Sequence, residues 1–251
     1  MLNIAIMGNG RMGSLIRQTA EGMRAADQNP AFNVVAQIGF DLERTQAAPA
    51  ADVLIDFSNV ATLPAVVAYV KRCGCALVSG TTGYSVDEME RLRALGNLAA
   101  VLHSGNYSIG VAALRHLTAQ ATRELPGFDV EICETHHNQK VDAPSGTANL
   151  LLDAVMDAQA AAGRGEYSPV FGRSGMCGAR DLHEIGMHSL RGGTVAGVHT
   201  VSFFGDEEEL SLTHRAESRR IFAIGALKTA EKLKDAPVGL HTLDELLFAR
   251  R

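Results

Sequence analysis

Short apolar runs alternate with amphipathic segments along the first hundred residues of the chain. Five of the apolar runs have the length of a strand, and they lie at residues 3–7, 32–40, 51–58, 75–79 and 99–103. The segments between them have the character of helices. Strand and helix in alternation predict a parallel sheet covered on both faces, with ligands beyond the carboxyl ends of its strands.

The pattern changes near residue 128. Residues 128–139 alternate like a half-exposed strand, 145–163 predict a helix, and 186–218 predict several strands joined by glycine turns. These features are typical of a second, α+β domain with an antiparallel or mixed sheet. Two more helices are expected at 220–233 and 243–248, and both could return to the first domain.

The bulk composition excludes several classes of protein. With 251 residues, 46% of them hydrophobic, the chain can bury a sizeable core. A net charge of -5 and the lack of any lysine or arginine run disfavour nucleic acid as a partner. The first residues have no basic region, and no apolar run is long enough to span a bilayer. We therefore expect a cytoplasmic protein with no membrane partner.

The four cysteines form no C-x-x-C pair. Cys73, Cys75, Cys133 and Cys177 are expected to be reduced and mostly buried, and metal binding by Cys73 and Cys75 is the weaker alternative. Cys177 lies in the glycine-rich segment 160–181, which is expected to be one long mobile loop.

A glycine turn follows the first apolar run. Gly8, Gly10 and Gly13 match G-x-G-x-x-G between a predicted strand and a predicted helix. The first glycine permits a tight turn, the second lets backbone approach a pyrophosphate, and the third allows close helix packing. The turn from Gly8 to Met12, including Asn9 and Arg11, is therefore a candidate dinucleotide site.

Further candidates for that site fall at the same sheet edge. Asp41 is the nearest acid after the second run and could hold ribose hydroxyls, although Gly39 or Phe40 could equally occupy that position. Two other strands end in tips rich in glycine and hydroxyl residues. These tips are Gly80, Thr81 and Thr82, and Ser104, Gly105, Asn106 and Tyr107. The alternative is that they are ordinary turns.

The segment "EICETHHNQKVDAPSGT", residues 131–147, concentrates ionisable groups. The strand delivers His136 and His137 to its end, and the following turn returns Lys140 close to them. All three can donate protons near neutral pH. The alternative is a strand end with exposed side chains. A metal site built from the histidines at 136, 137, 183 and 188 is disfavoured, because adjacent strand residues point to opposite faces.

The end of the same segment predicts an anion clamp. Ser145 is a plausible helix cap, which leaves the amides of Gly146 and Thr147 at the positive end of the helix, where they suit a carboxylate. Arg191 could pair with a second carboxylate, or it could be a surface residue in a turn.

These motifs carry a resemblance to a known family. The chain resembles the 4-hydroxy-tetrahydrodipicolinate reductases, or dihydrodipicolinate reductases, of the diaminopimelate route to lysine. The resemblance runs from end to end through "GNGRMG", "GTTG", "SGNYSIGV", "ETHHNQKVDAPSGTA" and "LTHRAESRRIFAIGAL".

The resemblance implies a fold and an assembly. It implies a Rossmann-like dinucleotide-binding domain with a parallel sheet, made from residues 1–106 and 217–251. Residues 107–216 would form an α+β domain with a mixed sheet, which binds substrate and forms a homotetramer through that sheet.

It also implies an activity and residue roles. NADH or NADPH would reduce a cyclic imine-type dicarboxylate, 4-hydroxy-tetrahydrodipicolinate, to tetrahydrodipicolinate. His136 would be the general acid/base, Lys140 the proton donor and His137 a substrate contact. Gly146 and Thr147 would grip a carboxylate, and the tips at 80–82 and 104–107 would line the cofactor.

Two departures from the family pattern leave the cofactor choice open. The spacing of Gly8 and Gly10 is one residue shorter than usual in the family, and no arginine directly follows Asp41. Two rival functions remain: another nicotinamide-dependent dehydrogenase of a small dicarboxylate, and a dinucleotide sensor without catalysis.

Overall fold

Two compact units make up the chain. The computed structural model describes residues 1–39 and 41–248, so that Phe40, one of the positions considered for the ribose contact, lies outside the described residues. Unit 1 comprises residues 1–108 together with the chain from 220 onward, and unit 2 comprises 109–219. The boundaries expected after 106 and before 217 lie within three residues of these.

Unit 1 is built around a six-stranded parallel sheet in the order β11-β5-β4-β3-β1-β2. Its strands are β1 (Leu2–Met7), β2 (Phe32–Ile38), β3 (Val53–Asp56), β4 (Ala76–Ser79), β5 (Ala100–His103) and β11 (Gly239–His241). Its helices are α1 (Arg11–Gly22), α2 (Leu42–Ala47), α3 (Leu63–Cys73), α4 (Val86–Arg93), α7 (Arg220–Leu233) and α8 (Leu243–Phe248), with short 3₁₀ turns at Val60–Thr62 and Ala94–Asn97.

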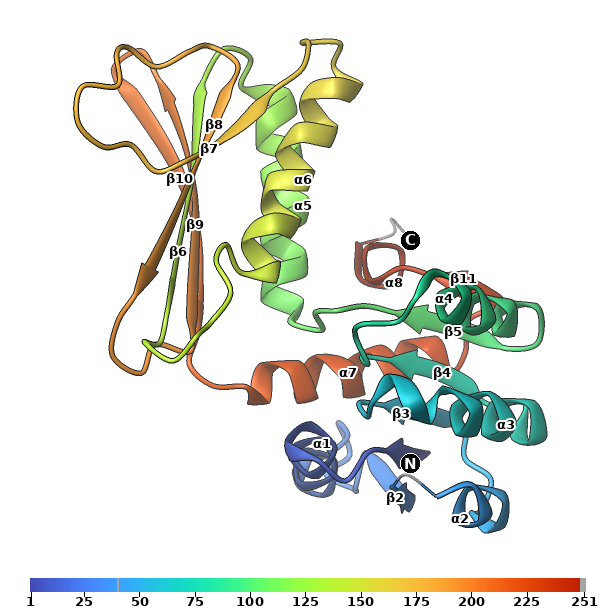
Figure 1. Ribbon diagram of the computed structural model, residues 1–251. Coiled ribbons are helices and arrows are strands. Elements are labelled where there is room, and N and C mark those ends of the chain that lie inside the picture. Colours follow the sequence, from blue (N-terminus) through green and yellow to red (C-terminus); the bar gives the residue numbers. More distant parts are fainter. Residues whose placement is uncertain (40, 249–251) are drawn as a thin grey trace. The chain divides into compact units, whose positions relative to one another are not determined.

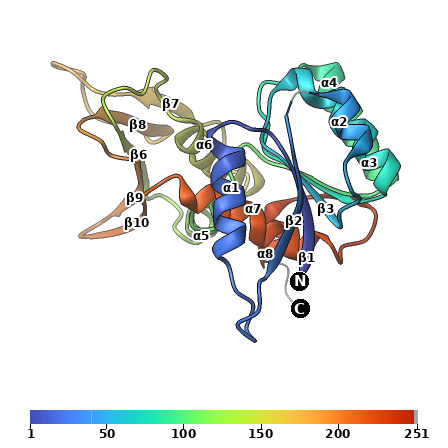
Figure 2. The same cartoon turned by 90° about the horizontal axis from the view of Figure 1, so that it is seen from below.

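Helices cover both faces of this sheet (Figure 2). Along β1, Ile4 and Ile6 pack with residues of α1 and α7, while Ala5 and Met7 pack with residues of α3 on the other face. This alternation leaves strands such as β3 buried on both sides, which explains their continuous apolar runs. The expected Rossmann-like arrangement is confirmed.

Unit 2 has a five-stranded mixed sheet in the order β10-β9-β6-β8-β7. Its strands are β6 (Asp129–His136), β7 (Ser168–Phe171), β8 (Glu184–Arg191), β9 (Gly197–Gly205) and β10 (Glu208–Ala216). Helices α5 (Ile109–Glu124) and α6 (Gly146–Ala161) lie side by side along one face of the sheet (Figure 1). Inward residues such as Ile132, Leu151 and Phe203 form the core. The predicted mixed sheet is confirmed.

The segment 160–181 was expected to be one loop, and that expectation is wrong in part. Residues 168–171 form β7, which pairs in parallel with β8. Arg173 and Arg180 then anchor the following residues to Glu131, with the nearest contacts at 3.0 and 3.2 Å. The sequence did not predict this strand, because Pro169 and the surrounding glycines are typical of a loop. The strand becomes recognisable through its pairing with β8.

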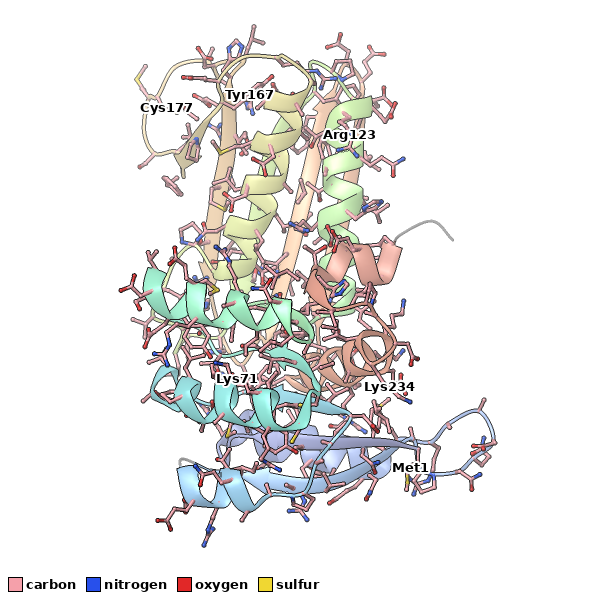
Figure 3. The ribbon with its side chains drawn as sticks, turned by 90° about the vertical axis from the view of Figure 1, so that its right-hand side faces the viewer. Met1, Lys71, Arg123, Tyr167, Cys177 and Lys234 are labelled. Atoms are coloured by element: carbon pink, nitrogen blue, oxygen red, sulfur yellow. The ribbon has the colours of Figure 1, made fainter. Side chains whose placement is uncertain are left out.

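The cysteines are free thiols, but they are not mostly buried. Cys75 is buried, Cys73 and Cys133 are half-buried, and Cys177 is exposed in the loop after β7 (Figure 3). Within the described ranges, none of the helices combines the length and apolar character needed to cross a bilayer.

Candidate functional site

The glycine turn of unit 1 has the predicted geometry. Gly8 has φ of +124°, and a Cβ there would collide with the carbonyl oxygen of Phe57. A Cβ on Gly13 would collide with the carbonyl oxygen of Gly8, so the helix packs directly on the turn. Gly10 precedes α1, and its Cβ position faces open space. The turn therefore exposes backbone at the positive end of α1, as an anion site requires.

A cavity of about 370 Å³ opens beyond the carboxyl ends of β3 and β4. The structure brings four of the predicted cofactor residues together in its wall: Met12, Gly80, Thr81 and Thr82. Residues 57–60 and Gly83 complete the lining, and sequence reasoning did not assign them to the cofactor. The polar end of the run "ADVLIDFS" was the available signal.

A buried carboxyl group connects the two segments that line this cavity. Asp56, at the end of β3, is fully buried and accepts hydrogen bonds from the hydroxyls of Ser58, Tyr84 (3.2 Å) and Ser79 (3.4 Å). The amide of Ser58 also donates to Thr81 Oγ1 at 2.9 Å. Burial raises the pKa of Asp56 above its ordinary value, although these hydroxyl groups oppose the shift. Asp56 thus joins the two segments that line the cavity.

An acidic and a basic residue follow β2, at the start of α2. Asp41 caps α2, accepting from the Arg44 amide at 3.1 Å, and Arg44 Nε lies 3.4 Å from the same carboxylate. The Arg44 side chain is 82% exposed. A Cβ on Gly39 would lie 2.5 Å from Asn9 Nδ2, so position 39 packs against the glycine turn.

The tip at 104–107 is ordered by its own hydrogen bonds. Ser104 Oγ donates to the Asn106 carbonyl at 2.8 Å, and Asn106 Oδ1 accepts from the Ser108 amide at 2.8 Å. Gly105 is exposed. The ring of Tyr107 is buried, and its hydroxyl donates to the Ser79 carbonyl at 2.7 Å. Only the backbone of Tyr107 remains to line a ligand.

In unit 2, a buried glutamate contacts His136, the residue predicted to act as general acid/base. Glu134 and His136 share one face of β6, and Glu134 has no exposed surface. Its Oε1 accepts from Arg191 Nη2 at 2.7 Å and from the Ser145 amide at 3.3 Å, while Oε2 is hydrogen-bonded to His136 Nδ1. Burial raises the pKa of Glu134, but hydrogen bonds from Arg191, His136 and Ser189 outweigh it and lower the pKa overall.

His199 of β9 lies beside this pair. It is buried, its Nε2 is 3.0 Å from Ser145 Oγ, and its ring meets that of His136 edge to face at 5.1 Å. Burial, reinforced by the charge of His136, lowers the pKa of His199 to about 4. His199 is therefore neutral near pH 7. Sequence reasoning missed both Glu134 and His199, because they act through partners far along the chain.

The turn after β6 positions Lys140. Its amide donates to the His137 carbonyl at 3.1 Å, and the His137 amide donates to Val195 O at 2.7 Å. The Lys140 ammonium donates to both oxygens of Asp142, at 2.7 and 2.9 Å. Arg191 also donates to the Asp142 carbonyl at 2.8 Å, so Arg191 is an internal anchor of the turn.

The predicted helix cap is confirmed. Ser145 precedes α6, and its hydroxyl accepts from the Ala148 amide at 3.2 Å. Gly146 and Thr147 are the first residues of α6, and Gly146 is exposed. Their amides lie at the positive end of the helix dipole.

The histidines considered for a metal are separated. His188 Nε2 pairs with Glu131 at 2.6 Å on the opposite face of the sheet from His136, and His183 meets the Tyr167 ring edge to face. Glu134, His136 and His199 do bring three possible ligand atoms within 4.8 Å of one another. The adjacent Arg191 already occupies Glu134 and repels a cation, so the cluster suits proton exchange better.

Comparison with known proteins identifies the family. Residues 2–107 match the family model described as dihydrodipicolinate reductase, N-terminus, and residues 110–247 match the model for its C-terminus. The chain belongs to the dihydrodipicolinate reductase family. It is 41% identical over 250 residues to the 4-hydroxy-tetrahydrodipicolinate reductase of Akkermansia muciniphila, covering 98% of both chains. The protein of the same name from Exiguobacterium sp. is 38% identical over 249 residues, covering 98% of this chain and 95% of its own length.

Solved structures share the fold. Dipicolinate-bound dihydrodipicolinate reductase from Paenisporosarcina sp. TG-14 superposes with a TM-score of 0.76 at 22% identity, covering 99% of this chain and all of the other. An amine dehydrogenase from Mycobacterium smegmatis gives 0.61 at 12% identity, covering 100% and 97%. As a dihydrodipicolinate reductase family member, the chain is an NAD(P)H-dependent oxidoreductase, and the prediction of enzyme class and cofactor is confirmed.

Proposed function

We propose that the chain reduces 4-hydroxy-tetrahydrodipicolinate to tetrahydrodipicolinate in the diaminopimelate route to lysine. The observation that carries the proposal is the grouping in unit 2 of His136, Lys140 and the first turn of α6. Proton donors next to an anion-binding helix end suit a reduced ring that carries carboxylates. In the overall reaction, NAD(P)H and one proton are consumed, and the ring hydroxyl leaves as water.

Unit 1 holds the cofactor in this proposal. The turn from Gly8 to Met12 binds the pyrophosphate at the start of α1, and Gly80, Thr81 and Thr82 line the cavity beside it. Ser104, Gly105, Asn106 and the Tyr107 backbone form a further edge, and Asp41 lies at the ribose position. When bound, NADH or NADPH supplies the hydride.

Unit 2 holds the substrate and manages its proton. The amides of Gly146 and Thr147 grip one carboxylate, and His137 contacts the substrate. Hydride addition leaves negative charge on the ring, which Lys140 stabilises as a cation and neutralises as proton donor. His136 then acts as acid/base, relaying a proton through the nitrogen that Glu134 does not occupy.

Loss of nicotinamide absorbance tests the activity. The substrate is made fresh from pyruvate and aspartate semialdehyde by the preceding synthase, and NADH and NADPH are supplied in turn. We expect the wild type to oxidise at least one of them, and Lys140→Ala to be slower by a factor of about 100 or more. The ratio of the two rates gives the cofactor preference. Dinucleotide binding without turnover would instead favour another dehydrogenase or a sensor.

The free face of the mixed sheet supports a homotetramer. Within the described residues of unit 2, no helix covers the face opposite α5 and α6 (Figure 1). Strand register places Thr200, Ser202, Ser211 and Thr213 on that face, joined by hydroxyl contacts of 2.9 and 2.6 Å, with Phe204 41% exposed. A face that carries small hydroxyl residues and a partly exposed aromatic residue suits a second copy of the chain.

Light scattering tests the assembly. We expect a tetramer mass for the wild type and a smaller mass for Ser202→Arg, while Asp153→Arg on the exposed side of α6 keeps the tetramer. A monomeric wild type would contradict the proposal. From this biosynthetic role we also infer that the enzyme is cytoplasmic.

A further inference from the structure

The two oxygens of the Glu134 carboxylate have different hydrogen-bond partners. Oε1 receives two donors, Arg191 Nη2 at 2.7 Å and the Ser145 amide at 3.3 Å. Oε2 is hydrogen-bonded to His136 Nδ1, and the Ser189 side chain is a further hydrogen-bond partner of the carboxyl group. Because the group is fully buried, water cannot substitute for any of these partners.

We propose that Glu134 is a positioning residue that holds His136 as the Nδ1–H tautomer, with Nε2 kept free to exchange a proton with the ligand. An ionised carboxylate can only accept hydrogen bonds, so the imidazole nitrogen that faces it must carry the hydrogen. In a neutral imidazole the other nitrogen is then an acceptor. The hydrogen bonds that lower the pKa of Glu134 keep it ionised at neutral pH.

The surroundings of Nε2 fit this role. A Cβ on residue 197 would lie 3.0 Å from His136 Nε2, and Gly197 supplies none. The glycine therefore preserves space beside the exchanging nitrogen. His199 meets the His136 ring edge to face and is neutral, so it adds no competing positive charge.

Glu134 also ties the acid/base residue to the anion clamp. Through the Ser145 amide, the same carboxylate fixes the residue that caps α6. One buried side chain thus sets the orientation of the His136 ring and the position of the helix end that would bind a carboxylate. Residue 134 connects two parts of the site without needing to touch the ligand.

Glu134→Gln reverses the hydrogen bond at His136. Arg191 and Ser145 both donate to the Oε1 position, so the glutamine carbonyl must take that position and the amide NH₂ must face His136. The glutamine NH₂ group donates a hydrogen bond to Nδ1, so Nδ1 must be unprotonated in order to accept it. In the neutral imidazole the hydrogen is then on Nε2. The substitution preserves side-chain size while imposing the opposite tautomer.

Magic-angle-spinning ¹⁵N spectra of the full chain labelled at histidine test the inference, with His136→Gln used to assign the signals. Above pH 8, we expect a protonated Nδ1 in the wild type and a protonated Nε2 in Glu134→Gln. Glu131→Gln, on the same strand but the opposite face, should keep the wild-type tautomer. A protonated Nε2 in the neutral imidazole of the wild type overturns the proposal, and this result does not require Glu134→Gln to fold.

Steady-state kinetics provide a second test of the inference, and this test rests on the proposed function. We expect Glu134→Gln to lower kcat roughly 10²- to 10⁴-fold with little change in KM, as wrong-tautomer variants of catalytic histidines do. Unchanged kcat with a reversed tautomer would show that the exchange at Nε2 is wrong. If the wild type lacks reductase activity yet the tautomers switch as expected, the proposed function fails and the positioning role stands.

Discussion

Lys140 donates to both carboxylate oxygens of Asp142, although the lysine side chain is 19% exposed and its partner 62%. The lysine is thus sheltered while its counter-ion faces solvent. Lys140 lowers the pKa of Asp142, so that carboxylate stays ionised and competes with any anionic ligand for the ammonium group. In the proposed function, an anionic substrate that contacts Lys140 would have to replace this internal pair.

Removing the competitor should strengthen ligand binding. In Asp142→Asn, the Lys140 ammonium no longer gives up an ion pair when a dicarboxylate arrives, and exposed pairs of this kind contribute about 0.2–1 kcal/mol. We therefore expect pyridine-2,6-dicarboxylate to bind roughly two- to fivefold more tightly, measured by calorimetry. Asp157→Asn, an equal charge change on the exposed side of α6, is the control. Weaker binding by Asp142→Asn would mean that the aspartate orients Lys140 for the ligand.

Glu131 should make stability depend on pH. Burial alone raises the pKa of Glu131, but hydrogen bonds from Arg173, His188 and Arg180 lower it to about 2. Because the folded-state pKa lies below the unfolded value, the stabilisation is complete above about pH 4.5 and is lost as the pH falls toward 2. Glu131→Gln should therefore cost about 2–3 kcal/mol at pH 7, and its deficit against the wild type should shrink below pH 4.5.

Thermal melting at pH 7, 5 and 4 measures that deficit. The aspartate at 206, outside the cluster and near a strand turn, offers a matched amide substitution, Asp206→Asn. A Glu131→Gln deficit that stays constant from pH 7 to pH 4 would argue against the ion-pair account.

Local rules explain what the sequence predicted well. The turn around Gly8 depends on backbone conformation and close packing within a few residues, and the Ser145 cap depends on an amide three residues away. Each of these features can be deduced from a short window.

Long-range partners explain what was missed. Glu134 depends on Arg191, which is 57 positions away, and β7 depends on its pairing with β8. Tyr107 resembled a ligand contact within its polar tip, yet its hydroxyl reaches back 28 positions to Ser79 and so belongs to the core. No local pattern distinguishes such a residue from a neighbour that faces solvent.

Asp56 should affect dinucleotide affinity through its hydrogen bonds to the segments that line the cavity. Asp56→Ala removes the common acceptor of Ser58 and Tyr84, and a buried donor left without its partner costs about 1–3 kcal/mol. We expect NADH to bind at least about tenfold more weakly, measured by fluorescence titration. Asp52→Ala removes an acceptor for the Asn3 amide before β3, away from the cavity, and should leave the affinity unchanged. Equal losses in both variants would indicate general destabilisation.

Two glycines of α1 should respond oppositely to alanine. A Cβ at residue 13 would overlap the Gly8 carbonyl, and this backbone contact cannot relax without moving the helix or the turn. Gly13→Ala should therefore lower stability by more than about 1 kcal/mol and abolish tight NADH binding. At Gly22, the last residue of the same helix, a Cβ would meet no atom within 4 Å, so Gly22→Ala should raise stability by about 0.5–1 kcal/mol through helix propensity and leave binding intact. Melting curves and NADH titration of the two variants measure both effects. Tight binding by Gly13→Ala would mean that the turn can bind a dinucleotide without the close contact between α1 and β1.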